Sequence, residues 1–201
     1  MRFLALAALA LTAACASTKT VAPLASARMV SDFGSYELHR VGLMPPVGTR
    51  LTQQQQDDIQ AACLAEFSAG SAVEVVRLTA FDLEAIPSLE PHRKGTYSGR
   101  TVLAVANRYR LDGLLIPTVT DLQVHPPQRL GLSMDLVSAE TGQALWNSSV
   151  QLDASQERTR DSIEAWATTH QGDVSDHTWE VTLLSPKRFA RFAAYHLASL
   201  L

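Results

Sequence analysis

The chain has 201 residues, of which 46% are hydrophobic and 18% are charged, and its formal net charge at pH 7 is −3. This length suits one domain with a substantial apolar core. Because the balance is mildly acidic and no run of lysine or arginine occurs, the composition excludes an electrostatic surface for nucleic acid, which is therefore not expected as a partner.

The first residues have the order of a secretory signal. One basic residue, Arg2, precedes an apolar run over residues 3–11 and small residues at positions 12–14, and Cys15 follows. The apolar run is too short to span a bilayer. We therefore predict a signal peptide over residues 1–14.

The stretch LTAAC at the end of this signal resembles a bacterial lipobox. The resemblance implies that the sulfur of Cys15 carries lipid and that Cys15 becomes the first residue of the mature chain. Several acyl chains would hold the protein at a membrane almost permanently. Two alternatives are an ordinary cleaved signal with a soluble product and an uncleaved structural helix. Residue 16 is Ala rather than the Asp that favours inner-membrane retention in such proteins, so we expect the outer membrane, with the domain facing the periplasm.

The second cysteine, Cys63, lies four residues after Ile59 and four before Phe67, which places the three on one helix face. If Cys15 carries lipid, Cys63 has no partner for an intramolecular disulfide. We expect a buried, inert thiol rather than a nucleophile or a redox sensor.

Residues 15–35 are rich in Ala, Ser and Thr and show no sustained apolar period, so they are interpreted as the lipidated N-terminus and a tether, parts of which could pack. Residues 36–201 are expected to form one α/β domain. Its first strand is centred on residues 41–44 and stops at two prolines. A helix over residues 52–70 follows, with Thr52 and Gln55 placed for a capping box, and then a strand over residues 73–78.

The apolar pattern continues with a second helix over residues 100–110 and three successive strands over residues 113–124, 130–139 and 143–152. A last helix begins at Ser185 and Pro186. The predicted order is β-α-β-α-β-β-β-α. Since helical crossovers join parallel strands and tight turns join antiparallel ones, we expect a mixed sheet of about five strands with helices packed on it.

A polar insertion is expected around residues 153–184, with a short helix near residues 162–168. It contains Trp166 and Trp179. Aromatic side chains in a polar segment are typical of anchors at a protein interface, so both residues are candidates for contact with a partner. The alternative is that they cap the core from outside. Trp146, on the last predicted strand, is expected in the core.

Three features of the predicted domain resemble the family of the curli secretion lipoprotein CsgG, the N-terminal domain of TolB and the lipoprotein activators of penicillin-binding proteins. They are the early strand VGLMPPV, Asp112 before a long apolar strand, and the hairpin DLVSAETGQALW with its Thr-Gly turn and Leu-Trp pair. The match covers about residues 38–152 and the final helix. It implies binding and assembly in the envelope without covalent chemistry. The short connection HPPQ argues against a pore, which needs long alternating strands.

The residues offer little for catalysis or for a cofactor. Ser175-Asp176-His177 contains the residue types of a triad, but three adjacent residues cannot converge on one substrate, so a polar loop is expected there. His170 and His177 are a weak metal signal, and the charged loop His92-Arg93-Lys94 is expected to be solvated. No metal, cofactor or enzymatic activity is therefore expected.

The resulting expectation is an outer-membrane lipoprotein that acts as a non-enzymatic adaptor or assembly factor in envelope or surface-structure biogenesis. The alternative is a regulatory lipoprotein that activates a peptidoglycan-synthesising enzyme. The expected partners are the membrane, through Cys15, and an envelope protein; a second copy of the chain is left open.

Overall fold

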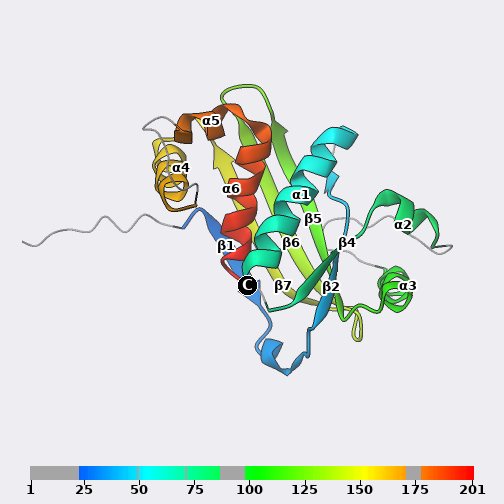
Figure 1. Cartoon of the computed structure of the whole chain (residues 1–201). Helices are drawn as coiled ribbons and strands as arrows, with labels where there is room; N and C mark the ends of the chain where they lie inside the picture. Colours follow the sequence, from blue (N-terminus) through cyan, green and yellow to red (C-terminus); the bar gives the residue numbers. More distant parts are fainter. Residues whose placement is uncertain (1–22, 49, 71, 87–97, 171–177) are drawn as a thin grey trace, which may run out of the picture.

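A computed structural model describes residues 23–48, 50–70, 72–86, 98–170 and 178–201. Within these residues one seven-stranded mixed sheet has the order β1-β7-β6-β5-β2-β4, and the short β3 pairs with β5. Helices lie on both sides of it (Figure 1).

The strands are β1 (Ala25–Met29), β2 (Arg40–Leu43), β3 (Val47–Gly48), β4 (Glu74–Arg77), β5 (Gly113–Gln123), β6 (Arg129–Ser138) and β7 (Ala144–Asp153). The helices are α1 (Gln53–Gly70), α2 (Ala80–Glu84), α3 (Gly99–Tyr109), α4 (Glu157–His170), α5 (Thr178–Leu184) and α6 (Pro186–Ala198), and a 3₁₀ turn, η1, covers Phe33–Ser35.

The predicted α/β class is confirmed. β2 pairs in parallel with β4 and with β5, as the helical crossovers require, and β5, β6 and β7 form an antiparallel meander. The sheet has seven strands rather than about five, because β1 and β3 join it. β1 lies inside the range 15–35 that was interpreted as a tether and pairs with β7 along all five of its residues. The described part of that range from Ala25 to Met29 therefore belongs to the domain.

The helix boundaries follow local capping chemistry. The backbone N–H of Thr52 donates to the Gln55 side chain (2.9 Å), and the N–H of Gln55 donates to the Thr52 hydroxyl (3.3 Å), which completes the predicted capping box of α1. At α6 the Ser185 hydroxyl accepts from the N–H of Arg188, and Pro186 occupies the first turn.

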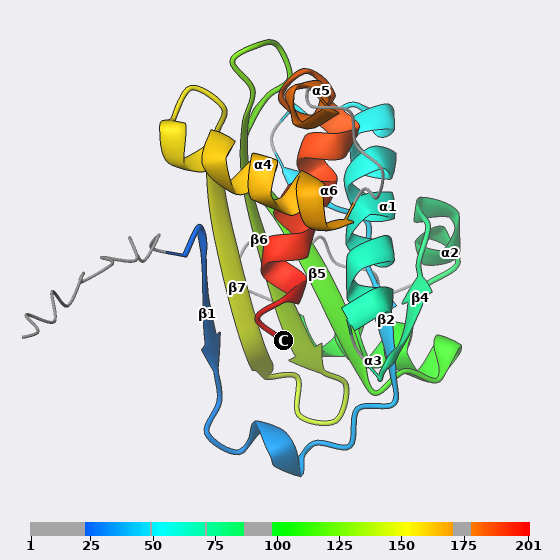
Figure 2. The same ribbon diagram turned by 60° about the vertical axis from the view of Figure 1, so that its left-hand side comes forward.

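Two apolar layers hold the helices on the sheet. α1 and α6 pack side by side on one face, where Phe67, Phe189 and Phe192 join the larger core cluster (Figure 2). α2 and α3 pack on the other face against a smaller cluster that includes Leu114 and Ile116. Alternate residues of β5 thus serve both layers, as the two-residue period of a strand dictates.

The expected insertion around residues 153–184 is more regular than the sequence suggested. Its helix runs over Glu157–His170 instead of residues 162–168, and α5 covers Thr178–Leu184. The helices α4 and α5 pack against each other, and α5 also packs on α6. The segment is therefore part of the folded body in its described residues.

None of the helices in the described ranges has the length and apolar character needed to cross a bilayer.

Candidate functional site

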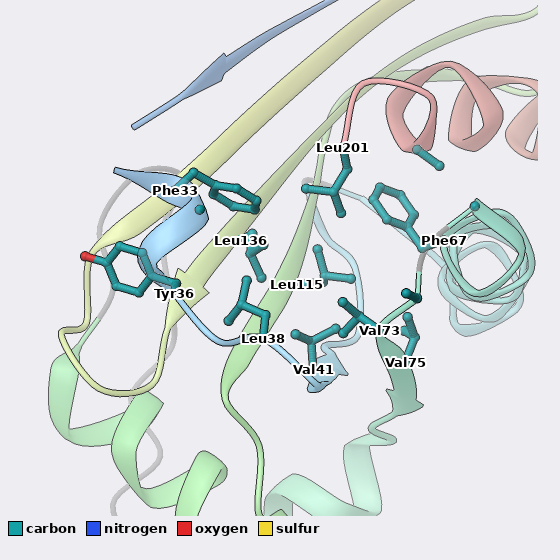
Figure 3. Close-up of a pocket in the computed structure, with 14 residues that line it drawn as sticks. Phe33, Tyr36, Leu38, Val41, Phe67, Val73, Val75, Leu115, Leu136 and Leu201 are labelled. Carbon is teal, nitrogen blue, oxygen red and sulfur yellow. The ribbon is translucent and has the colours of Figure 1, made fainter. Parts of the chain in front are cut away.

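A cavity of about 350 Å³ lies at one end of the sheet, between the strands and the C-terminal ends of α1 and α6 (Figure 3). Its walls come from seven parts of the fold: the segment before β2, strands β2, β4, β5 and β6, and the last turns of the two helices. The lining residues are Phe33, Gly34, Tyr36, Leu38, Val41, Phe67, Gly70, Ala72, Val73, Val75, Leu115, Leu136, Ala198 and Leu201.

The floor of the cavity is built by strand register. Leu115 of β5 lies opposite Leu136 of β6, and Val41 of β2 lies opposite Val75 of β4. These four side chains point to the sheet face that α1 and α6 cover, because alternate residues of a strand share a face. Leu115 and Leu136 are almost fully buried, so the floor is a continuous hydrocarbon surface.

Small residues leave the hollow open. A Cβ atom added at Gly34 or at Gly70 would meet nothing within 4 Å, so neither position is crowded. Ala72 and Ala198 also line the cavity and extend only one carbon from the backbone. The volume that larger side chains would fill at these positions therefore stays empty.

The segment that covers the cavity is fixed at both ends. The N–H of Val30 donates to the carbonyl of Leu145 (2.9 Å), where the chain leaves β1. At the start of β2 the carboxylate of Asp112 accepts the backbone N–H groups of His39 and Arg40, each at 2.8 Å. Asp112, noted in the sequence for its place before β5, thus ties β5 to β2 and positions the segment between Val30 and His39.

On the helix side, aromatic contacts shape the wall. Phe67 of α1 meets the ring of Trp146 edge-on, with ring centroids 6.0 Å apart. The indole N–H of Trp146 donates to the carbonyl of Leu200 (3.0 Å), which holds the segment after α6 over the end of the sheet. Trp146 is buried in the core, as expected from its strand position.

The chemistry of the cavity is that of a binding site. Among the lining side chains, only Tyr36 carries a polar atom, and its hydroxyl points away from the other labelled side chains in Figure 3. Pockets for ligands are typically 300–1,000 Å³ and mostly apolar. The arrangement therefore suits capture of an apolar group.

The predicted residues fall into two groups. Cys15, with the signal peptide, lies outside the described residues, as do His92-Arg93-Lys94 and Ser175-Asp176-His177. The two tryptophans of the insertion are described, and the structure does not bring them to the cavity.

Trp166 lies inside the fold. It is 5% exposed, and its ring packs against Phe192 (centroids 5.5 Å apart) and stacks on His170 (5.8 Å). This burial supports the alternative in which Trp166 belongs to the core. Trp179 of α5 is half-buried and packs against the same core cluster, and its contact with a partner stays a prediction.

Cys63 is fully buried in α1, as predicted. Burial raises the pKa of its thiol to about 12, so the reactive thiolate is scarce at neutral pH. Within the described part of the chain, no three His, Cys, Asp or Glu residues come together in a way that could hold a metal ion.

Comparisons with known proteins find no matching family model and no matching curated protein. Among solved structures, a PelC dodecamer from Paraburkholderia phytofirmans is similar over 82% of this chain and 97% of its own, with 13% identity and a TM-score of 0.45. Lipoprotein GNA1162 from Neisseria meningitidis is similar over 68% of this chain and 99% of its own (14%, TM-score 0.45).

The C-terminal domain of LpoB from Escherichia coli is similar over 56% of this chain and 82% of its own, with 15% identity and a TM-score of 0.39. These distant structural neighbours thus include a bacterial lipoprotein. The predicted resemblance to CsgG and to the N-terminal domain of TolB stays a prediction.

Proposed function

We propose that this protein is an outer-membrane lipoprotein, held by lipid on Cys15, that acts as a non-enzymatic adaptor or assembly factor in the envelope. Its cavity at the end of the sheet would receive an apolar side chain of the partner protein. The observation that supports this proposal is the cavity itself, which has about 350 Å³ of open space and an apolar lining.

The energetics favour binding of an apolar side chain. Moving a leucine or phenylalanine side chain from water into such surroundings stabilises a complex by about 1.5–3 kcal/mol. Part of the lining is already fixed in the free protein, because Leu115, Leu136 and Phe67 are buried and the covering segment is held by Asp112. Little ordering cost therefore opposes binding.

The anchor is supported by the sequence LTAAC and by its position in the chain. Seven residues separate Cys15 from Pro23, where the described domain begins. A chain of that length is enough to set a folded body beside a membrane without placing it inside the bilayer.

A photo-crosslinking amino acid at the mouth of the cavity tests the adaptor role. Tyr36 is the best position because it lines the cavity and its hydroxyl end points away from the other labelled side chains in Figure 3. The matched control replaces Phe81 of α2, an exposed aromatic residue away from the cavity. In intact cells, we expect position 36 to crosslink one envelope protein that position 81 does not, with mass spectrometry identifying it. Equal patterns from both positions would contradict a binding role for the cavity.

A cavity-filling variant provides the second arm. Ala72→Trp places a large ring in the hollow, whereas Ala69→Trp adds the same ring to an exposed position of α1 that does not line it. We expect Ala72→Trp alone to abolish the crosslink from position 36. If the recovered partner is a peptidoglycan synthase whose turnover rises when the protein is added, the regulatory alternative is the correct one.

A further inference from the structure

The end of the domain opposite the cavity carries apolar side chains that project outward. On α5, Val181 is 44% exposed and Leu184 is 64% exposed. Residues three apart on a helix share a face, so these two form one outward-facing pair. Leu183 and Trp179 pack inward on the core cluster, so α5 itself is docked and its outer face remains uncovered by the described chain.

The hairpin between β5 and β6 contacts α5, and the first turn of α6 follows α5 directly along the chain. The hairpin between β5 and β6 presents exposed Pro126 and Pro127, and the Gln128 side chain donates to the carbonyl of Leu183 (2.8 Å), which holds the hairpin against α5. Lys187 and Arg188 follow in the first turn of α6, and Glu180 is the acidic residue of α5. Apolar side chains beside basic ones are the pattern that binds the interface of an anionic bilayer.

The chain also enters the domain at this end. A guanidinium nitrogen of Arg158, in the first turn of α4, donates to the carbonyl of Pro23, just before β1. The N–H of Ala154, between β7 and α4, donates to the carbonyl of Gln128 (2.9 Å), and Gln128 in turn holds α5. Pro23, the hairpin and α5 are therefore linked by these hydrogen bonds together with the short chain segment from Ala154 to Arg158.

The cavity lies at the other end of the same strands. β1 runs away from Pro23, from Ala25 beside Val150 to Met29 beside Trp146, and Trp146 is the strand neighbour of Leu136 in the cavity floor. Figure 2 shows β1 leading from the side of α4 to the opposite end of the sheet. Seven residues lie between Cys15 and Pro23, and the eight Cα–Cα steps from one to the other span at most about 29 Å when fully extended.

We propose that the α5 end of the domain lies against the bilayer, with Val181 and Leu184 in the membrane interface and Lys187 at the headgroups. This orientation rests on the proposed lipid anchor at Cys15. It turns the cavity away from the membrane, toward proteins of the periplasm. In this orientation the exposed face of α5 binds the lipid surface, and the cavity binds a protein.

Site-specific labelling of the full lipidated protein tests the orientation. An environment-sensitive thiol dye is attached at L184C, with L103C on α3 as the matched control, since Leu103 is also an exposed leucine on a helix. Cys63 should stay unlabelled because it is fully buried and burial raises its thiol pKa to about 12. Each labelled protein is reconstituted into vesicles of phosphatidylethanolamine and phosphatidylglycerol with and without brominated acyl chains.

Brominated chains should quench the dye at position 184 at least about twofold more than the dye at position 103, because only the former would reach the acyl boundary. Equal quenching at the two positions, or stronger quenching at 103, would overturn the orientation. Flotation of the vesicles separates this result from the anchor itself: protein that fails to float refutes the lipid on Cys15, whereas protein that floats without quenching at 184 refutes only the orientation.

Discussion

The two ends of the sheet use apolar side chains in opposite ways. At the cavity end, Leu115, Leu136 and Phe67 are at most 2% exposed and surround a hollow. At the α5 end, Val181 and Leu184 are 44% and 64% exposed and surround nothing in the described chain. Apolar side chains thus line a hollow at one end and project from the surface at the other. The difference lies in which side of a packed element each residue occupies.

The largest expected effect concerns the anchor on which this division depends. Cys15→Ser should move the protein from the membrane fraction to the soluble fraction almost completely, because each buried methylene contributes about 0.8 kcal/mol and several chains would be lost. Fractionation of cell envelopes measures it.

The same variant sharpens the comparison of the two ends. Weak residual binding of Cys15→Ser to anionic vesicles should depend on Leu184 and should disappear in the Leu184→Asp double variant. Protein that stays in the membrane fraction without Cys15 would show that something other than lipid holds it there.

Truncating one leucine at each end of the sheet should change the free energy of unfolding by different amounts, because one leucine is buried and the other is exposed. Leu115→Ala removes a buried side chain of the cavity floor and should lower the free energy of unfolding by about 2–5 kcal/mol. Leu184→Ala removes an exposed one and should change it by less than about 0.5 kcal/mol. Urea denaturation of the two variants measures both values. A comparable loss at the two positions would mean that Leu184 is packed rather than projecting.

The smallest effect is a pH dependence at the cavity end. Burial lowers the pKa of His196, whose ring lies against Phe192 with centroids 4.6 Å apart. The unfolded chain, with a histidine pKa of about 6.5, binds the proton more readily. The contribution of neutral His196 to stability is therefore complete above about pH 6.5 and is lost as the pH falls toward its lowered folded pKa.

His196→Phe should reduce this dependence. The fall in unfolding free energy between pH 7.5 and pH 5 should be smaller in the variant than in the parent, and the other histidines cancel in that comparison. An unchanged pH slope would show that His196 is not the residue that senses the proton.

Much of the fold could be predicted because the signals are local. The capping residues Thr52 and Ser185 lie within three residues of the groups that they cap, so the starts of α1 and α6 were correct. The meander followed from the alternation of apolar residues over residues 130–136 and from the turn residues on either side of that stretch, and the structure buries both faces of β6 from Leu130 onward. Such patterns predict the structure correctly because capping and periodicity depend on residues within a single strand or helix.

β1 was not predicted as a strand because its sequence, ASARM, contains no β-branched or aromatic residue, and only Ala25 is buried in the fold. It joins the sheet through backbone hydrogen bonds to β7. Backbone hydrogen bonds do not depend on the side chain, so they cannot be recognised from the amino-acid composition. Trp166 was placed in a polar segment by its neighbours in sequence, but the turn of α4 brings its ring onto Phe192.

The cavity could not be predicted either, since its lining comes from parts of the chain that lie far apart in the sequence. Gly34, Gly70 and Ala72 are small residues in or beside turns, where small residues are common for reasons of backbone conformation. They leave an open cavity only because the fold brings them together over Leu115 and Leu136.

By itself, the sequence determined the α/β class, the order of the central strands and helices, and the burial of Cys63, because periodicity and capping depend on neighbours along the chain. The sequence also predicts lipid on Cys15, because the lipobox resemblance depends only on consecutive residues and not on the folded structure. The tertiary structure decided which apolar residues enclose a space and which project from the surface. That choice depends on how distant segments pack, since an apolar side chain is buried only when another part of the chain arrives to cover it.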